Sequence, residues 1–158
     1  MQYGSFFKRF GAWVLDMIIT AVLSGILGMA ALSLVALALS LDGILFQLIA
    51  NFLLWVTLAV MLLLHFFYFG FFWSRQGNSL GMKAFEVKVV RRTPGAKLSF
   101  VRAGLRGTFG YWISGLVFGL GYLWAAFDRR REAWHDKLFD TAVVREFPSE
   151  SAPEADQG

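Results

Sequence analysis

The chain has 158 residues, of which 57% are hydrophobic and only 16% are charged, whereas soluble domains carry about 25% charged residues. This composition excludes an ordinary soluble globular domain, and the absence of cysteine excludes disulfide scaffolds, zinc ribbons, iron–sulfur sites and cysteine nucleophiles. Three ranges, 17–41, 43–74 and 107–127, contain no charged residue, and each reaches the ~20 residues that cross a hydrocarbon core. We therefore expect an integral membrane protein whose partner is the lipid bilayer. Its net charge of +4 does not indicate a nucleic-acid partner.

Two long apolar segments open the chain. The first, 12–41, has an apolar core roughly twice as long as that of a secretory signal, so we expect a membrane helix that is retained. Asp42 and Gly43 leave almost no loop before the second segment, 43–74. The two helices therefore form an antiparallel hairpin with a tight turn on one side of the membrane. Aromatic residues crowd the chain just before Arg75, as they do at membrane interfaces.

The loop 75–106 is strongly basic. It contains eight basic residues against one acid, Glu86, and under the positive-inside rule such a loop is cytoplasmic. A hairpin returns the chain to the side on which it began. We therefore expect the N-terminus, with Lys8 and Arg9, to be cytoplasmic as well.

The third apolar segment, 107–127, has two possible topologies. If it crosses the membrane, the basic run 129–131 lies outside, against the positive-inside rule. A re-entrant helical hairpin would return to the cytoplasm, and it is allowed where its broken backbone is buried in protein. We favour re-entry, because five glycines weaken the helix and because a strand predicted at 85–90 could pair with the β-branched run 141–144.

One domain is expected at this length. The predicted fold is an all-α membrane protein, with a two-span helical hairpin, a third glycine-rich membrane segment and a small cytoplasmic β-like loop. The last residues, 148–158, are polar and acidic, and they predict a disordered tail.

Asp16 is the most informative polar residue of the first segment. It lies one to two turns inside the helix, where burying a carboxylate costs about 2.5 to 3.5 kcal/mol on insertion scales. The Arg9 side chain, seven positions earlier, leans toward the headgroups, so we expect a partner from another element. The candidates are Arg102, Arg106 and His65. The alternatives are a structural ion pair or interfacial solvation on the one hand, and a proton or cation site on the other.

A thin polar stripe runs along the second segment. Gln47, Asn51 and His65 fall on one helix face at 100° per residue, and Thr20 continues the face of Asp16 on the first segment. Interhelical hydrogen bonds, worth about 0.6 kcal/mol each in a membrane bundle, would explain the stripe. The other explanation is a polar lining for a pathway.

Two shorter patterns carry weaker signals. The sequence from Gly77 to Gly81 matches the G-x-S-x-G of serine hydrolases, but it follows a membrane helix and leads toward a strand, so it predicts a turn. Gly115 and Gly119 form a G-x-x-x-G that would allow close helix packing. No metal-ligand cluster and no nucleophile with a base is visible in the sequence, so we expect no enzyme activity, no metal and no cofactor.

Several motifs together carry a family resemblance. Arg9 is followed by Ala12 and Asp16 in the first helix, and Arg102 or Arg106 opens the third segment. A turn of the type G-x-T-x-G-M-K corresponds to Gly77, Ser79, Gly81 and Lys83. The closing element corresponds to Asp128, Trp134, His135, Asp136 and the run 141–144, with Asp140 where glycine is usual. These motifs resemble the RDD family of small bacterial integral membrane proteins, which is named for one arginine and two aspartates.

The resemblance implies one RDD-like membrane domain over 6–147, in a bacterial inner membrane. It also implies an unsettled activity, with transport of some ligand suspected and ion/proton exchange suggested for some members. By carry-over, Arg9, Asp16 and Asp136 form the signature trio, and an ion pair between Arg9 and Asp136 would clamp the N-terminus to the closing element. Further possible ion-pair partners are Asp128 and His135.

Two functional hypotheses follow. The first is transport of monovalent cations and protons, centred on Asp16. Because a chain with so few helices cannot enclose a pathway alone, this transport would need a homo-oligomer or a membrane partner protein. The second is a non-transporting membrane scaffold or assembly partner, which would bind other proteins through the glycine-rich segment and the basic loop.

Overall fold

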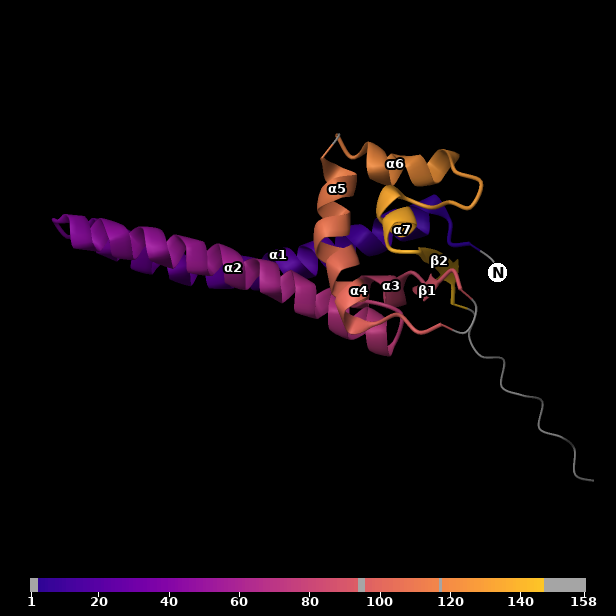
Figure 1. The fold of residues 1–158 in the computed structure, drawn as a ribbon, viewed down its shortest axis with the longest axis horizontal. Coiled ribbons are helices and arrows are strands. Elements are labelled where there is room, and N and C mark those ends of the chain that lie inside the picture. Colours follow the sequence, from indigo (N-terminus) through magenta and orange to yellow (C-terminus); the bar gives the residue numbers. More distant parts are fainter. Residues whose placement is uncertain (1–2, 94–95, 117, 147–158) are drawn as a thin grey trace, which may run out of the picture.

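The computed structural model describes residues 3–93, 96–116 and 118–146, so the predicted tail at 148–158 lies outside the described residues. Its longest feature is a hairpin of two helices, α1 (Phe6–Leu39) and α2 (Ile44–Arg75) (Figure 1). The Ser5 hydroxyl caps α1 by accepting a backbone N–H at 3.3 Å, and Gly43, with φ of 121°, makes the turn into α2. Both helices are long and apolar enough to cross a membrane. The predicted two-span hairpin is confirmed, with α1 beginning earlier than expected.

The outer part of the hairpin has an apolar surface on all sides. Few residues in the most apolar stretch of either helix are buried, and most of the large apolar side chains from Ile18 to Leu63 are exposed. This surface is much larger than the apolar patches of soluble proteins. Hydrocarbon is a suitable surrounding for it, because a helix satisfies its backbone hydrogen bonds internally. The hairpin is therefore the membrane-spanning part of the protein.

The rest of the described chain packs at the open end of the hairpin (Figure 1), and we call this part the head. Its elements are α3 (Leu80–Ala84), β1 (Val87–Arg91), α4 (Phe100–Leu105), the π-helix η1 (Arg106–Gly110), α5 (Tyr111–Gly115), α6 (Leu120–Phe127), α7 (Trp134–Leu138) and β2 (Thr141–Arg145). Phe69 and Trp73 of α2 share a core with Ala12 of α1 and with Val87 and Val143 of the two strands. The open end of the hairpin is therefore the base on which the head is built.

A two-stranded antiparallel sheet joins three distant parts of the chain. β1 pairs with β2 so that Val89 lies opposite Val143, and the Gly4 amide donates to the Val143 carbonyl at 3.0 Å. The sheet predicted from 85–90 and 141–144 is thus present. Because these hydrogen bonds cannot form across a bilayer, the start of α1, β1 and β2 all lie on one side of the membrane.

The third apolar segment is bent rather than one straight span. The chain runs as a helix through α4, η1 and α5, breaks at Gly119, and continues as α6 at an angle of 92°. Figure 1 shows α5 lying across the hairpin at its open end rather than along it. A single full crossing between β1 and β2 would place the two strands on opposite sides of the bilayer, which the sheet excludes. The segment therefore begins and ends on one side.

The glycines of this segment have different roles. No atom of the described chain lies within 4 Å of a Cβ built at Gly115 or Gly119, so the close helix packing predicted for this pair does not occur within one chain. Gly119 instead supplies the φ of +74° at the break before α6, which glycine adopts at no steric cost. Close packing occurs at Gly107, where a Cβ would collide with the Phe69 ring, and at Gly121, where it would collide with α5.

Candidate functional site

Asp16 is fully buried in α1, where the hairpin meets the head. Its Oδ1 accepts hydrogen bonds from the Tyr68 hydroxyl at 2.7 Å and from the Gly81 amide at 2.9 Å. Its Oδ2 accepts from the Ser79 hydroxyl. All three donors are neutral, and among the described residues no basic side chain lies within ion-pair distance of Asp16.

The partners predicted for Asp16 are wrong. Arg106 donates to Asp136 instead, and the His65 ring bonds to a carbonyl one turn earlier in its own helix at 3.0 Å. Arg102 lies half-buried at the start of the third segment. The turn after α2 packs on Asp16 instead and supplies two of its three donors.

The turn between α2 and α3 has the shape needed to cover Asp16. Gly77 has a φ of +77°, and its carbonyl accepts a β1 amide at 2.6 Å. Ser79 is fully buried and donates to the carboxylate. A Cβ at Gly81 would collide with the α1 backbone and come within 2.9 Å of the carboxyl group, so only glycine allows this approach. Lys83, the last motif residue of the turn, is exposed.

A second buried carboxylate, Asp136 of α7, lies between two arginines. Arg9 of α1 donates to Oδ2, and Arg106 of η1 donates to Oδ1. The side chains of Arg106 and Asp136 are 1% and 0% exposed. The ion pair hypothesised between Arg9 and Asp136 is therefore present, and Arg106 shares the same carboxylate.

Other hydrogen bonds fix the position of this cluster. Arg106 Nε donates to the Thr141 hydroxyl at 3.0 Å, and the Ala133 amide donates to Asp136 Oδ2 at 3.0 Å. The cluster thus ties together the first turn of α1, the third segment and the closing element. These parts are distant in sequence, so the cluster acts as a tertiary clamp.

The charges of the cluster keep Asp136 ionised. Burial alone would raise the pKa of Asp136, but the positive charges of Arg9 and Arg106 lower it well below its usual range. Two guanidinium groups thus face one carboxylate. Beside them, burial lowers the pKa of His135 to about 3, so this imidazole is neutral at pH 7, with its Nδ1 2.8 Å from the Ser114 hydroxyl.

Asp128 organises the loop between α6 and α7. Its carboxylate accepts from the Lys137 ammonium at 2.6 Å and from the backbone amides of Arg130 and Glu132 at 3.0 and 3.2 Å. Glu132 in turn pairs with Arg92 at 2.5 Å. The acidic residue that follows the last apolar run therefore has a local, structural role.

The family of the chain follows from comparison with known proteins. The family model described as the RDD family matches residues 3–140. The chain belongs to the RDD family. No curated protein and no solved structure matched it. The predicted RDD signature, Arg9, Asp16 and Asp136, lies where the hairpin meets the head, but Asp16 belongs to a separate hydrogen-bonded group from the other two.

One departure from the RDD pattern is explained by the backbone. Asp140 stands where the pattern has glycine, and its φ is +55°. Glycine adopts this left-handed region freely, and aspartate is among the few residues that tolerate it. The Asp140 carboxylate also pairs with Arg91 at 2.9 Å. Asp140 therefore adopts the backbone conformation that the turn before β2 requires, although it is not glycine.

The residues predicted to line an RDD pathway do not meet in one chain. Thr20 is buried, and its hydroxyl donates to the Asp16 carbonyl at 2.9 Å. Gln47 and Asn51 are exposed on the apolar surface of α2. His65 lines an open cavity of about 270 Å³ beside α5. A lining made of these side chains would therefore need more than one copy of the chain.

Two residues of the site, Tyr68 and Ser114, are not predicted from the sequence. Tyr68 lies in the aromatic run before Arg75, and its hydroxyl, the one hydroxyl group in 66–73, is the feature that distinguishes it from its neighbours. Ser114 carries no local signal, because only the fold of the RDD domain brings α5 against His135.

Proposed function

We propose that this RDD protein exchanges a monovalent cation for protons across the membrane, with Asp16 as the group that binds each in turn. The observation that carries the proposal is the neutral surrounding of a fully buried carboxylate. A buried carboxylate without a paired positive charge is costly, and on membrane-spanning helices such carboxylates mark ion or proton pathways. Its charge is balanced when either a proton or a cation binds.

The oxygen atoms around Asp16 suit a hard monovalent cation. Besides the carboxylate, Ser79 and Tyr68 present hydroxyl oxygens to the same point, and hard cations prefer oxygen ligands. A cation bound to the ionised carboxylate and a proton bound to it each leave the site neutral. Because only one of them occupies the carboxylate at a time, the two compete, and this competition is the basis of exchange.

Asp136 is unsuited to this task. It is held by Arg9 and Arg106, and both positive charges favour its ionised form. A carboxylate fixed in this way does not change its protonation state in the physiological range. We therefore assign Asp136 to the clamp that holds the head together, and Asp16 to the transport step.

The proposal includes a homo-oligomer. One chain contributes two membrane-spanning helices, which cannot surround a pathway. Gln47 and Asn51 are exposed on the apolar surface of the hairpin, and their amide groups are available to a neighbouring helix. Packing against a second copy would satisfy them, as interhelical hydrogen bonds do in other membrane bundles.

The test is proton flux in proteoliposomes that contain an internal pH dye and are given pulses of Na⁺, K⁺ or Li⁺. We expect a cation-dependent pH change with the wild-type protein and at least a tenfold slower change with Asp16→Asn. The matched control is Asp42→Asn, which removes the same charge at the exposed turn of the hairpin and should leave flux unchanged. Flux retained by Asp16→Asn, or absent from a correctly folded wild-type protein, would reject the proposal.

A second candidate function is a membrane scaffold. The observation in its favour is the open face of α5, where Trp112 is 72% exposed and Gly115 has free space above it. Gly115→Ile should then reduce the assembly size measured by light scattering. Gly25→Ile is the control, because Gly25 lies equally open on α1. An assembly that loses no copies in Gly115→Ile would reject this role for α5.

A further inference from the structure

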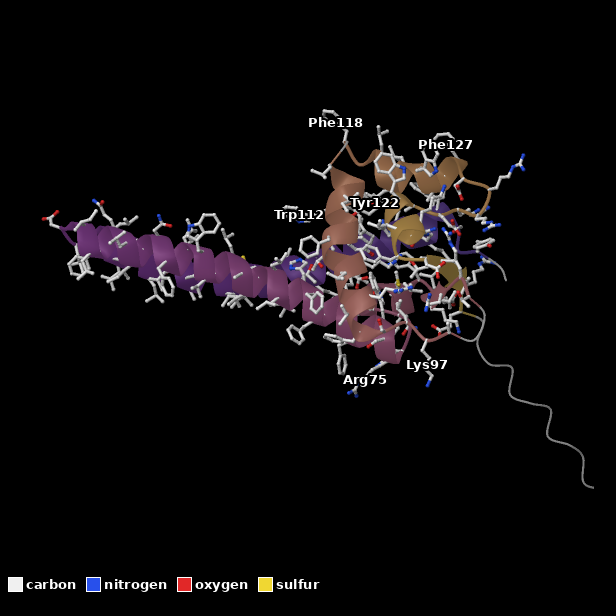
Figure 2. The ribbon with its side chains drawn as sticks, viewed as in Figure 1. Arg75, Lys97, Trp112, Phe118, Tyr122 and Phe127 are labelled. Carbon is white, nitrogen blue, oxygen red and sulfur yellow. The ribbon has the colours of Figure 1, made fainter. Side chains whose placement is uncertain are left out.

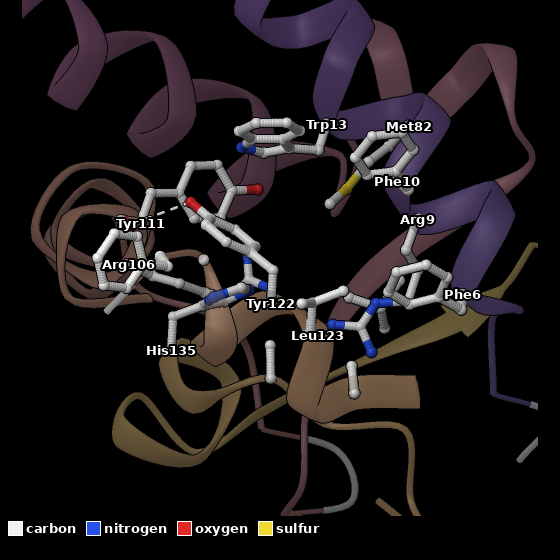
Figure 3. A pocket seen from close by; sticks show the side chains of 15 residues that line it. Phe6, Arg9, Phe10, Trp13, Met82, Arg106, Tyr111, Tyr122, Leu123 and His135 are labelled. Atoms are coloured by element: carbon white, nitrogen blue, oxygen red, sulfur yellow. Dashed lines mark hydrogen bonds between the residues drawn. The ribbon is translucent and has the colours of Figure 1, made fainter. Parts of the chain in front are cut away.

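A cavity of about 310 Å³ lies in the head between the first turns of α1 and helix α6. Figure 3 shows the rings of Phe10 and Trp13 on one side of it and the guanidinium groups of Arg9 and Arg106 on the opposite side. Tyr122 of α6 is a further aromatic lining residue. The described lining residues include two cations and no acidic side chain. The cavity is therefore apolar on one side and positively charged on the other.

The positive side of the cavity is incompletely neutralised. Asp136, behind the lining, is the one carboxylate that the two arginines share. Arg106 is 1% exposed, and although its Nε and Nη2 are bonded, its Nη1 has no hydrogen-bond partner among the described residues. Buried charged donors are normally paired. An anion in the cavity would balance the positive charge that Asp136 leaves uncompensated.

The mouth of the cavity is apolar. Three exposed apolar side chains line the cavity at its mouth. Phe10 and Leu123 are 51% and 46% exposed, and Phe118, at the break before α6, is almost fully exposed. Trp112 of α5 and Phe127 at the end of α6 are further exposed aromatic residues of the head (Figure 2). Aromatic residues gather at the membrane interface. A mouth lined by apolar side chains suits the acyl chain of a lipid.

We propose that this cavity binds an anionic lipid, with its carboxylate or phosphate headgroup on Arg106 and Arg9 and its acyl chain along the aromatic side. Arginine forks match both headgroups geometrically, and basic pockets at the membrane surface bind anionic lipids. A cationic ligand is disfavoured despite the aromatic rings, because two guanidinium groups would repel it. The volume lies at the small end of ligand pockets, so the cavity takes the headgroup and the first part of the chain, while the remainder stays in the bilayer.

The test uses the full chain, delipidated in a neutral detergent and titrated under native mass spectrometry, which counts bound molecules. The probes are oleate, dioleoyl phosphatidate, oleoyl lysophosphatidylcholine and inorganic phosphate. We expect one bound oleate or phosphatidate, and at least tenfold weaker binding of the zwitterionic lipid and of phosphate. Equal binding of the zwitterionic lipid would mean that charge is not recognised. Equal binding of phosphate would mean that the cavity binds a free anion rather than a lipid. Either result, or no binding at all, overturns the proposal.

Variants locate the bound lipid. Leu123→Trp fills the mouth and leaves every charge in place, so oleate affinity should fall at least tenfold. Leu120→Trp is the matched control, because Leu120 lies on the same helix and is outside the lining; it should bind as the wild type does. Arg106→Gln should also reduce the affinity for oleate at least tenfold. If Arg106→Gln fails to fold, Leu123→Trp still tests the proposal. Full affinity in Leu123→Trp would place the lipid elsewhere and overturn the proposal.

Discussion

Asp136 has two arginine partners, whereas Asp16 has only neutral ones. Breaking a buried ion pair by removing one partner costs about 3–5 kcal/mol, so substitutions at Asp136 act mainly on folding. Exchanging the charges of Arg9 and Asp136 would place an arginine against Arg106. Such an exchange therefore cannot restore the clamp, even though the original pair is present.

At the same scale, His135 makes the stability of the head depend on pH. Burial lowers its pKa to about 3 in the folded protein, against about 6.5 in the unfolded chain. Between these pH values the unfolded state binds more protons than the folded state. The contribution of neutral His135 to the free energy of unfolding is therefore complete above pH 6.5 and is lost as the pH falls. We expect a loss of about 2 kcal/mol between pH 7 and pH 5, measured as the free energy of unfolding in detergent.

The chain has one other histidine, which provides the control for this prediction. His65→Gln is the matched control, because it removes the imidazole of the hairpin and leaves His135 in place. His135→Gln should flatten the pH dependence over the same range. Equal pH dependence in the wild-type protein and in His135→Gln would show that another group is responsible.

At the scale of elements, the head depends on contacts that its short pieces cannot make alone. A two-stranded sheet is marginal by itself; here Val87 and Val143 pack on Phe69 and Trp73 of α2. The turn before α3 is likewise held by its bonds to Asp16. The helices of the hairpin therefore supply the surface on which the smaller elements become stable.

Gly81 tests this dependence. In Gly81→Ala the new Cβ would collide with the α1 backbone, so we expect a loss of about 1–3 kcal/mol, the usual cost of overpacking. Gly115→Ala is the control, because no described atom lies near a Cβ at that position, and the free energy of unfolding should stay within about 0.5 kcal/mol of the wild-type value. Thermal unfolding in detergent measures both. Equal unfolding temperatures for the two variants would contradict the close contact between α3 and α1.

At the scale of the whole molecule, the sheet fixes the topology. Strands β1 and β2 lie before and after the third apolar segment and pair with each other, so that segment returns to the side from which it came. Within the described residues, α1 and α2 are the helices that cross the bilayer.

The natural absence of cysteine allows this topology to be checked with single introduced cysteines. We expect Lys97→Cys and Arg129→Cys to react with a membrane-impermeant thiol reagent from the same side. Ser40→Cys, at the turn of the hairpin, should react only from the other side. All three positions are exposed. Labelling of Arg129→Cys from the side of Ser40→Cys would show that the third segment crosses the membrane.

The sequence by itself determined the membrane class, the two spans and the small sheet. Each follows from a local property: the length of an uncharged run against the thickness of a bilayer, or the alternation of apolar residues along a strand. The motifs also indicated the family and the pairing of Arg9 with Asp136. These features needed no knowledge of how distant segments meet.

The tertiary structure alone decided which groups surround the two carboxylates. Tyr68 and Ser79 lie far from Asp16 in sequence, and they reach it because the turn after α2 folds back onto α1. The second arginine on Asp136 is likewise brought there by η1. The physical reason is that the partner of a buried charge is set by which segments pack against it, and this depends on the whole fold rather than on residue spacing.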